Sequence, residues 1–341
     1  MRIAKSSKQN KALDLCSLME EKGLRIIERF GSAVISDVRH PELLQVLREV
    51  SGYMKDTFRP ALTSFCCEAV GGKPEIAEDA ALMFTLGATA SGIHDDIIDN
   101  QFRKRSRNTI FGSHGLEMAL LVGDLLFFRA WSMLQEIVRK INQPEKVAYI
   151  IESYRLSSIK ICEGELREIS CKKKLDTDLE DWQEILRDVN YDLEARTRVG
   201  AILGGGSEVE IVALSEVGKR LALMLGLKDD TLDSFGLLGN LSHRIMYESV
   251  PLPLLFAAQS SRKWYLRIDS ILKKQHILSL DISELLQICS ESGAFSYIRD
   301  LAKKNTEEAN EKLQILKPST GRDVLEFMIK KSFYSIDRLC L

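Results

Sequence analysis

Residues 95–99 read Asp-Asp-Ile-Ile-Asp and end an apolar stretch, residues 81–93, whose sequence is ALMFTLGATASGI. A helix that is apolar on nearly all sides belongs in the centre of a bundle, so this stretch predicts a buried helix that ends in carboxylates. On that helix Asp95 and Asp99 are four residues apart and share one side. A second pattern of the same form, Asp-Asp-Thr-Leu-Asp, occupies residues 229–233 at the end of another apolar segment.

The two acidic patterns predict a metal site. Like charges this close repel, and a soluble fold would spread them apart unless they share cations. Mg²⁺ prefers oxygen ligands and is usually bound by one or two carboxylates together with substrate phosphates. Two facing patches therefore suggest a diphosphate held between Mg²⁺ ions, whereas the alternative is a pair of acidic helix ends that face solvent. The candidate ligands are Asp95, Asp96, Asp99, Asp229, Asp230 and Asp233.

The rest of the chain predicts further helices around these two. Apolar residues recur at helical spacing along most of the sequence, and no run of alternating β-branched residues predicts a strand. The N-terminal helix is expected within residues 1–30, from about residue 11. The other expected helices cover residues 42–54, 60–69, 75–99, 115–138, 146–171, 179–203, 208–232, 251–260, 268–278, 281–293, 294–316 and 321–341. We expect an all-α helical bundle that forms a single domain, residues 1–341.

Composition limits the class of protein. The 341 residues are 45% hydrophobic and 28% charged, which is ample material for a core, and the net charge of −2 gives no bulk attraction to nucleic acid. Seven cysteines without a CxxC pair indicate reduced thiols. The N-terminus lacks the apolar run of a signal peptide, and no segment approaches 18 uncharged apolar residues. We therefore expect a cytoplasmic protein without a transmembrane helix.

Several short motifs resemble those of the trans-isoprenyl diphosphate synthases, also called polyprenyl synthetases. The resemblance runs from about residue 33 to past residue 257. Its most specific pieces are IHDDIIDN at 93–100, GD at 123–124, GE at 164–165, RT at 196–197 and KDDTLD at 228–233. It implies a bundle of the isoprenoid synthase type, with the two acidic patterns facing a central cavity. It also implies a homodimeric prenyltransferase that uses Mg²⁺, three ions with the bound diphosphate.

The resemblance implies roles for individual residues. The two acidic patterns would hold Mg²⁺ on either side of an allylic prenyl diphosphate. Lys104 and Arg105 match paired basic residues that neutralise the same diphosphate, and Arg196 stands before Thr197 where the family usually has Lys. Mg²⁺ and Arg stabilise charge that develops on pyrophosphate as the carbon–oxygen bond breaks. The allylic cation left behind needs an apolar pocket without water.

Two small residues, Ala90 and Ser91, stand where short-product members of the family carry bulky aromatic residues. Small side chains there would leave the pocket floor open, so the resemblance implies a long prenyl chain. The alternative is that these residues only allow close packing of two helices. A long product would be poorly soluble, so we also expect transient contact with a membrane surface.

The sequence departs from the family at the residues that bind isopentenyl diphosphate, which is the usual second substrate. Residues 55–60 keep Arg59, but Asp56 stands where the key Lys is expected. A carboxylate in place of an ammonium opposes a diphosphate and can cost several kcal/mol in a poorly hydrated site. Three other family residues, a His, a Gln and a Lys, are replaced by Ala88, Gly226 and Ser249.

These departures favour transfer of the prenyl chain to an acceptor other than isopentenyl diphosphate, or to that substrate held in an atypical way. The polar pair His243 and Arg244 is a candidate contact for such an acceptor. One alternative is ordinary chain elongation with isopentenyl diphosphate. A terpene cyclase is a second, although aromatic residues are only 7% of the chain. A non-catalytic subunit is a third, although it need not keep both acidic patterns.

Overall fold

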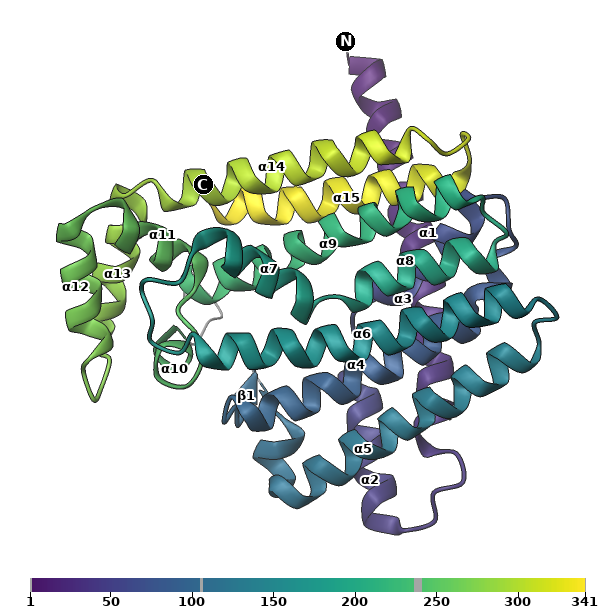
Figure 1. The fold of residues 1–341 in the computed structure, drawn as a ribbon, viewed down its shortest axis with the longest axis horizontal. Coiled ribbons are helices and arrows are strands. Elements are labelled where there is room, and N and C mark those ends of the chain that lie inside the picture. The colour runs from purple at the N-terminus through teal and green to yellow at the C-terminus, as the bar shows by residue number, and fades with distance from the viewer. Residues whose placement is uncertain (1, 105–106, 236–240, 341) are drawn as a thin grey trace. The chain divides into compact units, whose positions relative to one another are not determined.

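The computed structural model describes residues 2–104, 107–235 and 241–340, with the side chains of 2–11 and 233–235 outside this description. The described chain is almost entirely helical, and the prediction of an all-α fold is confirmed (Figure 1). The α-helices are α1 (Arg2–Ile35), α2 (Pro41–Tyr53), α3 (Phe58–Ala69), α4 (Glu78–Ile98), α5 (Ile110–Arg139), α6 (Pro144–Ser170), α7 (Leu179–Val189), α8 (Asp192–Leu203), α9 (Glu208–Phe235), α10 (Leu241–Tyr247), α11 (Leu252–Ser260), α12 (Arg262–Leu272), α13 (Ser279–Glu291), α14 (Ala294–Leu313) and α15 (Thr320–Leu339).

The chain divides into two compact units, each of which is described by itself. Unit 1 comprises Met1–Leu156, Asp192–Gly218 and Glu311–Met328. Unit 2 comprises Ser157–Tyr191, Lys219–Asn310 and Ile329–Leu341. The first acidic pattern lies in unit 1 and the second in unit 2. A single domain over residues 1–341, with the two patterns facing one cavity, stays a prediction.

Several local features differ from the sequence-based expectation. α10 was not expected, and α12 covers Arg262–Leu272 where the helix was expected over residues 268–278. The helix expected over residues 179–203 is interrupted between Val189 and Asp192, where the side chain of Asn190 donates a hydrogen bond to the Leu186 carbonyl at 3.0 Å. Such local side-chain bonds compete with helix continuation. The basic run after the first acidic pattern forms a short antiparallel hairpin, β1 (Arg103–Lys104) and β2 (Arg107–Asn108). Two-residue strands are too short to give an alternating pattern, so the sequence did not reveal them.

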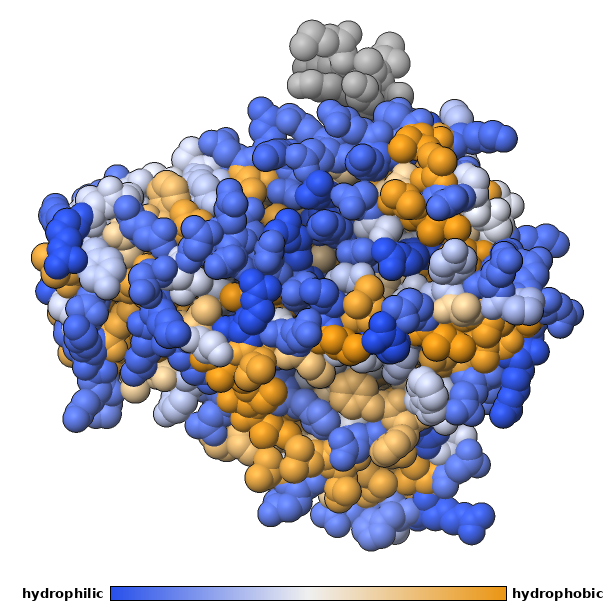
Figure 2. Space-filling view, viewed as in Figure 1, coloured by the Kyte–Doolittle hydropathy of each residue, from blue (hydrophilic) through white to orange (hydrophobic). Residues whose placement is uncertain are grey.

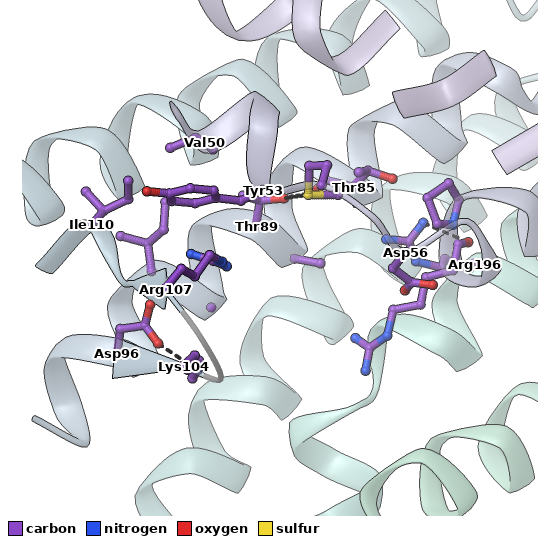
Figure 3. Close-up of a pocket in the computed structure, with 16 residues that line it drawn as sticks. Val50, Tyr53, Asp56, Thr85, Thr89, Asp96, Lys104, Arg107, Ile110 and Arg196 are labelled. Carbon is purple, nitrogen blue, oxygen red and sulfur yellow. Dashed lines mark hydrogen bonds and ion pairs between the residues drawn. The ribbon is translucent and has the colours of Figure 1, made fainter. Parts of the chain in front are cut away.

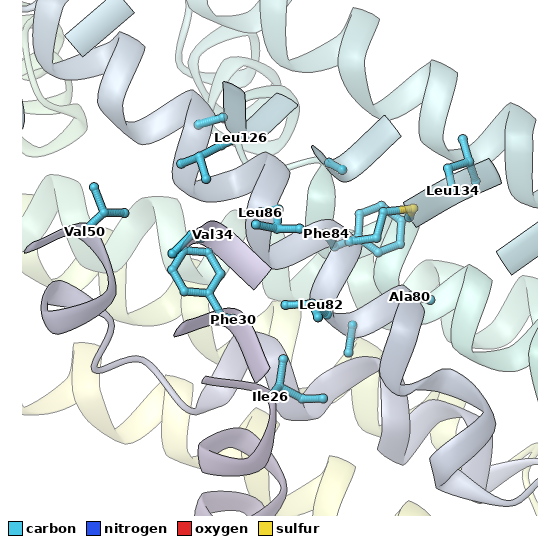
Figure 4. Close-up of a cluster of buried hydrophobic side chains, with 14 of the residues drawn as sticks. Ile26, Phe30, Val34, Val50, Ala80, Leu82, Phe84, Leu86, Leu126 and Leu134 are labelled. Carbon is cyan, nitrogen blue, oxygen red and sulfur yellow. The ribbon is translucent and has the colours of Figure 1, made fainter. Parts of the chain in front are cut away.

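The core of unit 1 surrounds α4. Residues 80–86 of this helix are all buried, and they pack with α5 and with side chains of α1 and α2, among them Phe30, Val34 and Val50 (Figure 4). The low amphipathicity of α4 seen in the sequence is therefore explained, because neighbours cover it on several sides. This packing fixes the helix that carries the first acidic pattern at its C-terminal end.

Unit 2 has its own buried elements around α7, α9 and α11. Trp182 of α7 is fully buried, and α11 buries Leu252, Leu254 and Leu255. A Cβ atom at Gly226 of α9 would lie 2.9 Å from the Leu186 Cβ, so no larger residue fits there without a shift of α7. The absence of the family's Gln at this position is thus linked to a close approach of two helices.

The long helix α5 leaves much of its apolar surface outward. Among the described residues, it is the one helix that is long and apolar enough to cross a membrane by length and composition alone, and 28% of its most apolar window is buried. The sequence analysis did not single it out, because Glu117, Asp124 and Arg129 interrupt the apolar run. In Figure 2, apolar side chains gather over the part of unit 1 where Figure 1 shows α5.

Candidate active site

The first acidic motif, Asp95, Asp96 and Asp99, lies at the C-terminal end of α4. Asp99 caps the helix, and its backbone N–H donates to the Asp95 carbonyl at 2.9 Å. Asp95 and Asp99 are partly exposed, whereas Asp96 is only 8% exposed. Asp95 and Asp99 are four residues apart, so the spacing predicts that they share one side of the helix.

Lys104 of the hairpin contacts this motif directly. Its Nζ lies 2.6 Å from Asp96 Oδ1 and 3.2 Å from Asp95 Oδ2 (Figure 3). Burial raises the pKa of the Asp96 carboxyl, while Lys104 opposes this rise. Burial lowers the pKa of Lys104, but the carboxylates of Asp95 and Asp96 raise it more, so the ammonium stays charged. The motif therefore has an internal cation before any ligand arrives.

His94 and the Gly123-Asp124 pair form a second contact between α4 and α5. A Cβ atom at Gly123 would lie 2.2 Å from His94 Nε2, so only glycine allows the ring to take this position. The same Nε2 is 3.6 Å from Asp124 Oδ1, and the His94 ring lies 5.5 Å from the Phe127 ring. This contact accounts for the glycine by steric fit and positions the end of α4.

A cavity of about 300 Å³ opens beside the first acidic motif, within unit 1 (Figure 3). Its apolar lining includes Val50, Ile93 and Ile110. Its charged lining consists of four cationic residues and two acidic ones: Arg59, Lys104, Arg107, Arg196, Asp56 and Asp96. A hollow with an apolar wall and an excess of cations suits a ligand with a hydrocarbon part and a multiply charged anionic part.

Arg196, a predicted substrate residue, lines this cavity from α8 and is 1% exposed. Its Nε donates to Asp192 Oδ2 at 2.9 Å, and Nη1 lies 3.3 Å from the Arg59 carbonyl. Burial lowers the pKa of the guanidinium, and Asp192 opposes this effect. Thr197 is fully buried and donates to the Glu194 carbonyl at 2.9 Å; it is not part of the cavity lining.

Asp56, which stands where the family's Lys is expected, has a structural role at the start of α3. Its Oδ1 accepts a hydrogen bond from the Phe58 N–H at 2.8 Å, as residues that precede a helix commonly do. Arg59 also lines the cavity, and its Nη1 lies 3.3 Å from Asp192 Oδ1. The Asp56 carboxylate also raises the pKa of the Arg196 guanidinium, a smaller effect than that of Asp192.

Arg107 and Tyr53 are cavity residues that the sequence analysis missed. The Arg107 guanidinium lies over the Tyr53 ring, 3.7 Å from its centroid. The basic run at residues 103–107 could have pointed to Arg107, but the sequence analysis assigned roles only to Lys104 and Arg105. Arg105, predicted to bind the diphosphate, lies outside the described residues.

The residues expected to set chain length lie on α4 near the cavity but do not line it. Ala90 is fully buried in the core of unit 1, and Ser91 is half-buried. Ala88, which replaces the family's His, does line the cavity, together with Thr89 and Gly92. The role of Ala90 and Ser91 in product length stays a prediction.

The second acidic motif, Asp229, Asp230 and Asp233, lies on α9 in unit 2. Asp229 is exposed, whereas Asp230 is 1% exposed. Asp230 accepts hydrogen bonds from Arg244 Nη2 at 2.5 Å, Trp182 Nε1 at 2.9 Å and the Leu252 N–H at 3.0 Å. The side chain of Asp233 lies outside the described residues. Asp230 therefore has three protein donors, and its assignment as a metal ligand stays a prediction.

Arg244 also contacts two residues that the sequence analysis discussed. Its Nη2 lies 3.5 Å from Glu168 Oε1 and 3.4 Å from Ser249 Oγ. Ser249 is fully buried and donates to the same Glu168 oxygen at 2.6 Å. Ser249, which replaces the family's Lys, thus lies beside a cation from another position.

The carboxylates of the two motifs differ in how well they could bind Mg²⁺. Within the described part of the chain, no group of three His, Cys, Asp or Glu side chains is arranged to hold a metal ion. Mg²⁺ needs only one or two carboxylates when a diphosphate supplies further oxygens, and the partly exposed Asp95 and Asp99 meet this need. The exposed Asp229 does so as well. Asp230 does not, because donors already surround it.

The sequence matches a known protein family and several individual proteins. Residues 40–288 match the sequence profile of the family described as Polyprenyl synthetase. The chain is 31% identical over 300 residues to a short chain isoprenyl diphosphate synthase of Methanothermobacter thermautotrophicus, which covers 85% of this chain and 90% of that protein. It is 26% identical over 315 residues to a geranylgeranyl diphosphate synthase of Methanosarcina mazei. This match covers 87% of this chain and 95% of that protein.

Solved structures include similar folds. The crystal structure of a geranylgeranyl pyrophosphate synthetase from Pyrococcus horikoshii matches with a TM-score of 0.81 and 27% identity, over 95% of this chain and 99% of that one. A decaprenyl diphosphate synthase from Rhodobacter capsulatus matches with a TM-score of 0.83 and 21% identity, over 96% and 99%. At that identity the second match shows the fold alone.

Proposed function

Since this chain belongs to the polyprenyl synthetase family and is a prenyltransferase, we propose that it elongates an allylic prenyl diphosphate with isopentenyl diphosphate. This proposal replaces the preference for a different acceptor that the sequence departures favoured. Relatives named as isoprenyl and geranylgeranyl diphosphate synthases support it. In this reaction the carbon–oxygen bond of the allylic diphosphate breaks, a carbon–carbon bond to isopentenyl diphosphate forms, and pyrophosphate and a proton are released.

The cavity of unit 1 is the observation that carries the proposal. The sequence indicated that the acceptor half of the site keeps Arg59 but has Asp56 and Ser249 where two Lys residues are expected. In the cavity, however, Arg59, Arg107 and Arg196 bring three guanidinium groups to one apolar hollow. Arginine is suited to bidentate recognition of phosphate oxygens, and these three groups come from separate parts of the chain. A diphosphate can therefore be bound here although Asp56 replaces the expected Lys.

For the ionising half of the site, we assign the allylic diphosphate to the first acidic motif. Asp95 and Asp99 would hold Mg²⁺, with Asp229 of the second motif as a further ligand, and three ions in all are part of this proposal. When bound, Mg²⁺ supplies positive charge to the departing pyrophosphate. Lys104, already 3.2 Å from Asp95, contributes a fixed positive charge beside the same oxygens.

The apolar part of the cavity supports the same chemistry. Val50 of α2 and Ile93 of α4 line it together with Ile110 at the start of α5. A wall of this kind keeps water from an allylic cation until the double bond of the second substrate attacks it. The one aromatic ring among the lining residues is Tyr53, and Arg107 lies over it, so little ring surface remains to stabilise cations as a cyclase would require.

A second candidate function is transfer of the prenyl chain to another acceptor. The observation that favours it is Asp56, a carboxylate that lines the cavity beside Arg59. An acceptor with a hydrogen-bond donor would be held by this carboxylate, whereas a diphosphate would not. Asp56 thus distinguishes the two candidates chemically.

The experiment that separates them measures Mg²⁺-dependent release of pyrophosphate from allylic diphosphates of five to 25 carbons, each with and without isopentenyl diphosphate. Elongation predicts release only when both substrates are present, with longer prenyl diphosphates as products. Release that does not need isopentenyl diphosphate, with alcohols or hydrocarbons as products, would contradict it.

For partners, we propose a homodimer formed through α5. Its exposed apolar side chains, among them Leu121, Phe128 and Trp131, give a surface that a second copy would cover. Transient membrane contact by the same surface and a cytoplasmic location stay predictions. No role in nucleic-acid binding is proposed for a chain with a net charge of −2.

A further inference from the structure

The two adjacent carboxylates of the second acidic motif have opposite surroundings. Asp229 is exposed, and Asp230 is enclosed by three elements of unit 2. The donors to Asp230 are the indole of Trp182 on α7, the guanidinium of Arg244 on α10 and the first backbone N–H of α11 at Leu252. Neighbouring helix positions point about 100° apart, so one carboxylate can face outward while the next faces inward.

The contacts of Asp230 are fixed by packing. Trp182 and Leu252 are fully buried, and both donate to the same oxygen, Oδ2, at 2.9 and 3.0 Å. Mg²⁺ demands near-octahedral geometry with short bonds to oxygen. To bind it, Asp230 would have to release donors that would then be buried without partners, which is unfavourable. The surroundings of Asp230 therefore disagree with a role as metal ligand.

Arg244 lies in a strongly acidic surrounding. Its Nη2 is 2.5 Å from Asp230 Oδ1 and 3.5 Å from Glu168 Oε1, and its Nε is 3.9 Å from Glu248 Oε2. The guanidinium is almost fully buried, at 7% exposure of the residue. The guanidinium of Arg244 can therefore play the electrostatic role of a bound metal ion, because its positive charge offsets negative charge that is shielded from solvent.

We propose that Arg244 is a built-in cation that takes the place of a metal ion on Asp230, and that Asp230 stabilises the packing of α9 through its contacts with Trp182, Arg244 and Leu252 instead of binding metal. In this arrangement, Asp229 is the metal-binding carboxylate of the adjacent pair. The inference rests on the proposed function, because the metal concerned is the one that binds with the diphosphate.

The test compares D229N with D230N by two measurements that do not need turnover. The first is binding of Mn²⁺, a spectroscopic probe for Mg²⁺, in the presence of inorganic pyrophosphate, followed by electron paramagnetic resonance. The second is the midpoint of thermal unfolding without ligands. We expect D229N to weaken Mn²⁺ binding at least about tenfold with an unchanged midpoint. We expect D230N to lower the midpoint and to leave Mn²⁺ affinity within about twofold of wild type.

Arg244 gives a sharper measurement, because the proposal predicts a change in the number of ions. R244Q leaves the Asp230 carboxylate without its cation, so we expect it to bind one more Mn²⁺ per chain than wild type. R244K keeps the charge and should keep the wild-type number. If R244Q does not fold, the double variant D230N/R244Q removes both charges together and should fold with the wild-type number of ions.

Two results would overturn the inference. One is loss of Mn²⁺ affinity in D230N equal to that in D229N, with no change in the unfolding midpoint. The other is an unchanged number of ions in folded R244Q. Failure of the metal-dependent part of the proposed function gives a different result, because wild-type protein would then bind no Mn²⁺ with pyrophosphate, while D230N would still lower the unfolding midpoint.

Discussion

Lys104 and Arg244 each contact carboxylates of one acidic motif before any ligand is present. Lys104 is on a surface hairpin and remains 42% exposed, so it can change partners when a diphosphate binds. Arg244 is buried and holds Asp230 in a closed set of contacts. We therefore propose different roles for two basic residues that lie near acidic patterns: Lys104 binds ligand in the first motif, and Arg244 offsets the charge of Asp230 in the second.

The role of Lys104 can be tested by K104Q. The substitution removes a charge beside the proposed site of the departing pyrophosphate, so we expect pyrophosphate release at saturating substrate to fall by about a hundredfold. R103Q is the matched control, because Arg103 is an exposed residue of the same strand. K104Q activity within about twofold of R103Q would contradict the assignment.

Product length is argued from Ala90 and Ser91. Ser91 is half-buried one turn before Asp95, so we expect S91F to fill space near the growing chain and shift products to shorter prenyl diphosphates. Ala90 is fully buried in the core, and A90F should instead destabilise the fold by about 1–3 kcal/mol through overpacking. Chromatography of products and thermal unfolding measure the two effects. An unchanged product distribution in S91F would remove Ser91 from the site.

At the residue scale, the sequence placed both acidic patterns near the ends of helices, which α4 and α9 confirm, whereas their roles as metal ligands stay predictions. Spacing on a helix predicts that Asp95 and Asp99 share one side. Spacing could not show that Asp230 faces inward, because this depends on Trp182 and Leu252, distant residues whose contacts form only in the folded chain. The same reason explains Arg107, whose place over Tyr53 depends on a hairpin with no sequence pattern of its own.

At the element scale, contacts with neighbouring helices hold both ends of α4 in place. At its start, Asp79 bonds Arg29 of α1 and Lys140 after α5, at 2.5 and 2.8 Å. At its other end, Gly123 of α5 admits the ring of His94. The sequence predicted the extent of α4 to within a few residues, because its apolar stretch is long and uninterrupted. It could not predict the break at Asn190, where one side-chain hydrogen bond decides the outcome.

The Asp79 contacts predict a dependence of stability on pH. Burial raises the pKa of the Asp79 carboxyl, but Arg29 and Lys140 outweigh it, so the pKa lies below the ordinary value of 3.8. A lowered pKa in the folded state stabilises the protein above the unfolded-state value, and this contribution is lost as the pH falls through the folded-state value.

We therefore expect D79N to lower the free energy of unfolding by about 1 kcal/mol at pH 7, because the carboxylate is partly exposed. The difference from wild type should shrink below about pH 4, where the wild-type carboxyl itself takes up a proton. Urea denaturation at several pH values measures this. A difference between D79N and wild type that is the same at pH 7 and pH 3 would show that the charge of Asp79 is not responsible.

At the scale of the whole molecule, α5 combines a buried face against α4 with an outward apolar face. Composition had suggested an ordinary soluble core and gave no sign of such a surface, because overall percentages do not show where apolar residues lie. The structure locates it on one helix.

A substitution on this face tests the proposed homodimer. Phe128 is 70% exposed, so F128E should leave the folded chain stable while placing a charge in the interface. We expect wild-type protein to sediment as a dimer and F128E as a monomer at micromolar concentration. Y334E is the control, since Tyr334 is an exposed aromatic residue on α15. A wild-type monomer, or an F128E dimer as stable as wild type, would contradict the proposal.

The hairpin that follows α4 has a consequence for how tightly ligands bind. Because Lys104 already offsets one of the two negative charges of Asp95 and Asp96, a divalent ion that arrives alone is attracted less than it would be by two carboxylates without a cation. A diphosphate offers Lys104 a different anion and so leaves both carboxylates for the ion. We therefore expect Mg²⁺ to bind more tightly together with the diphosphate than alone.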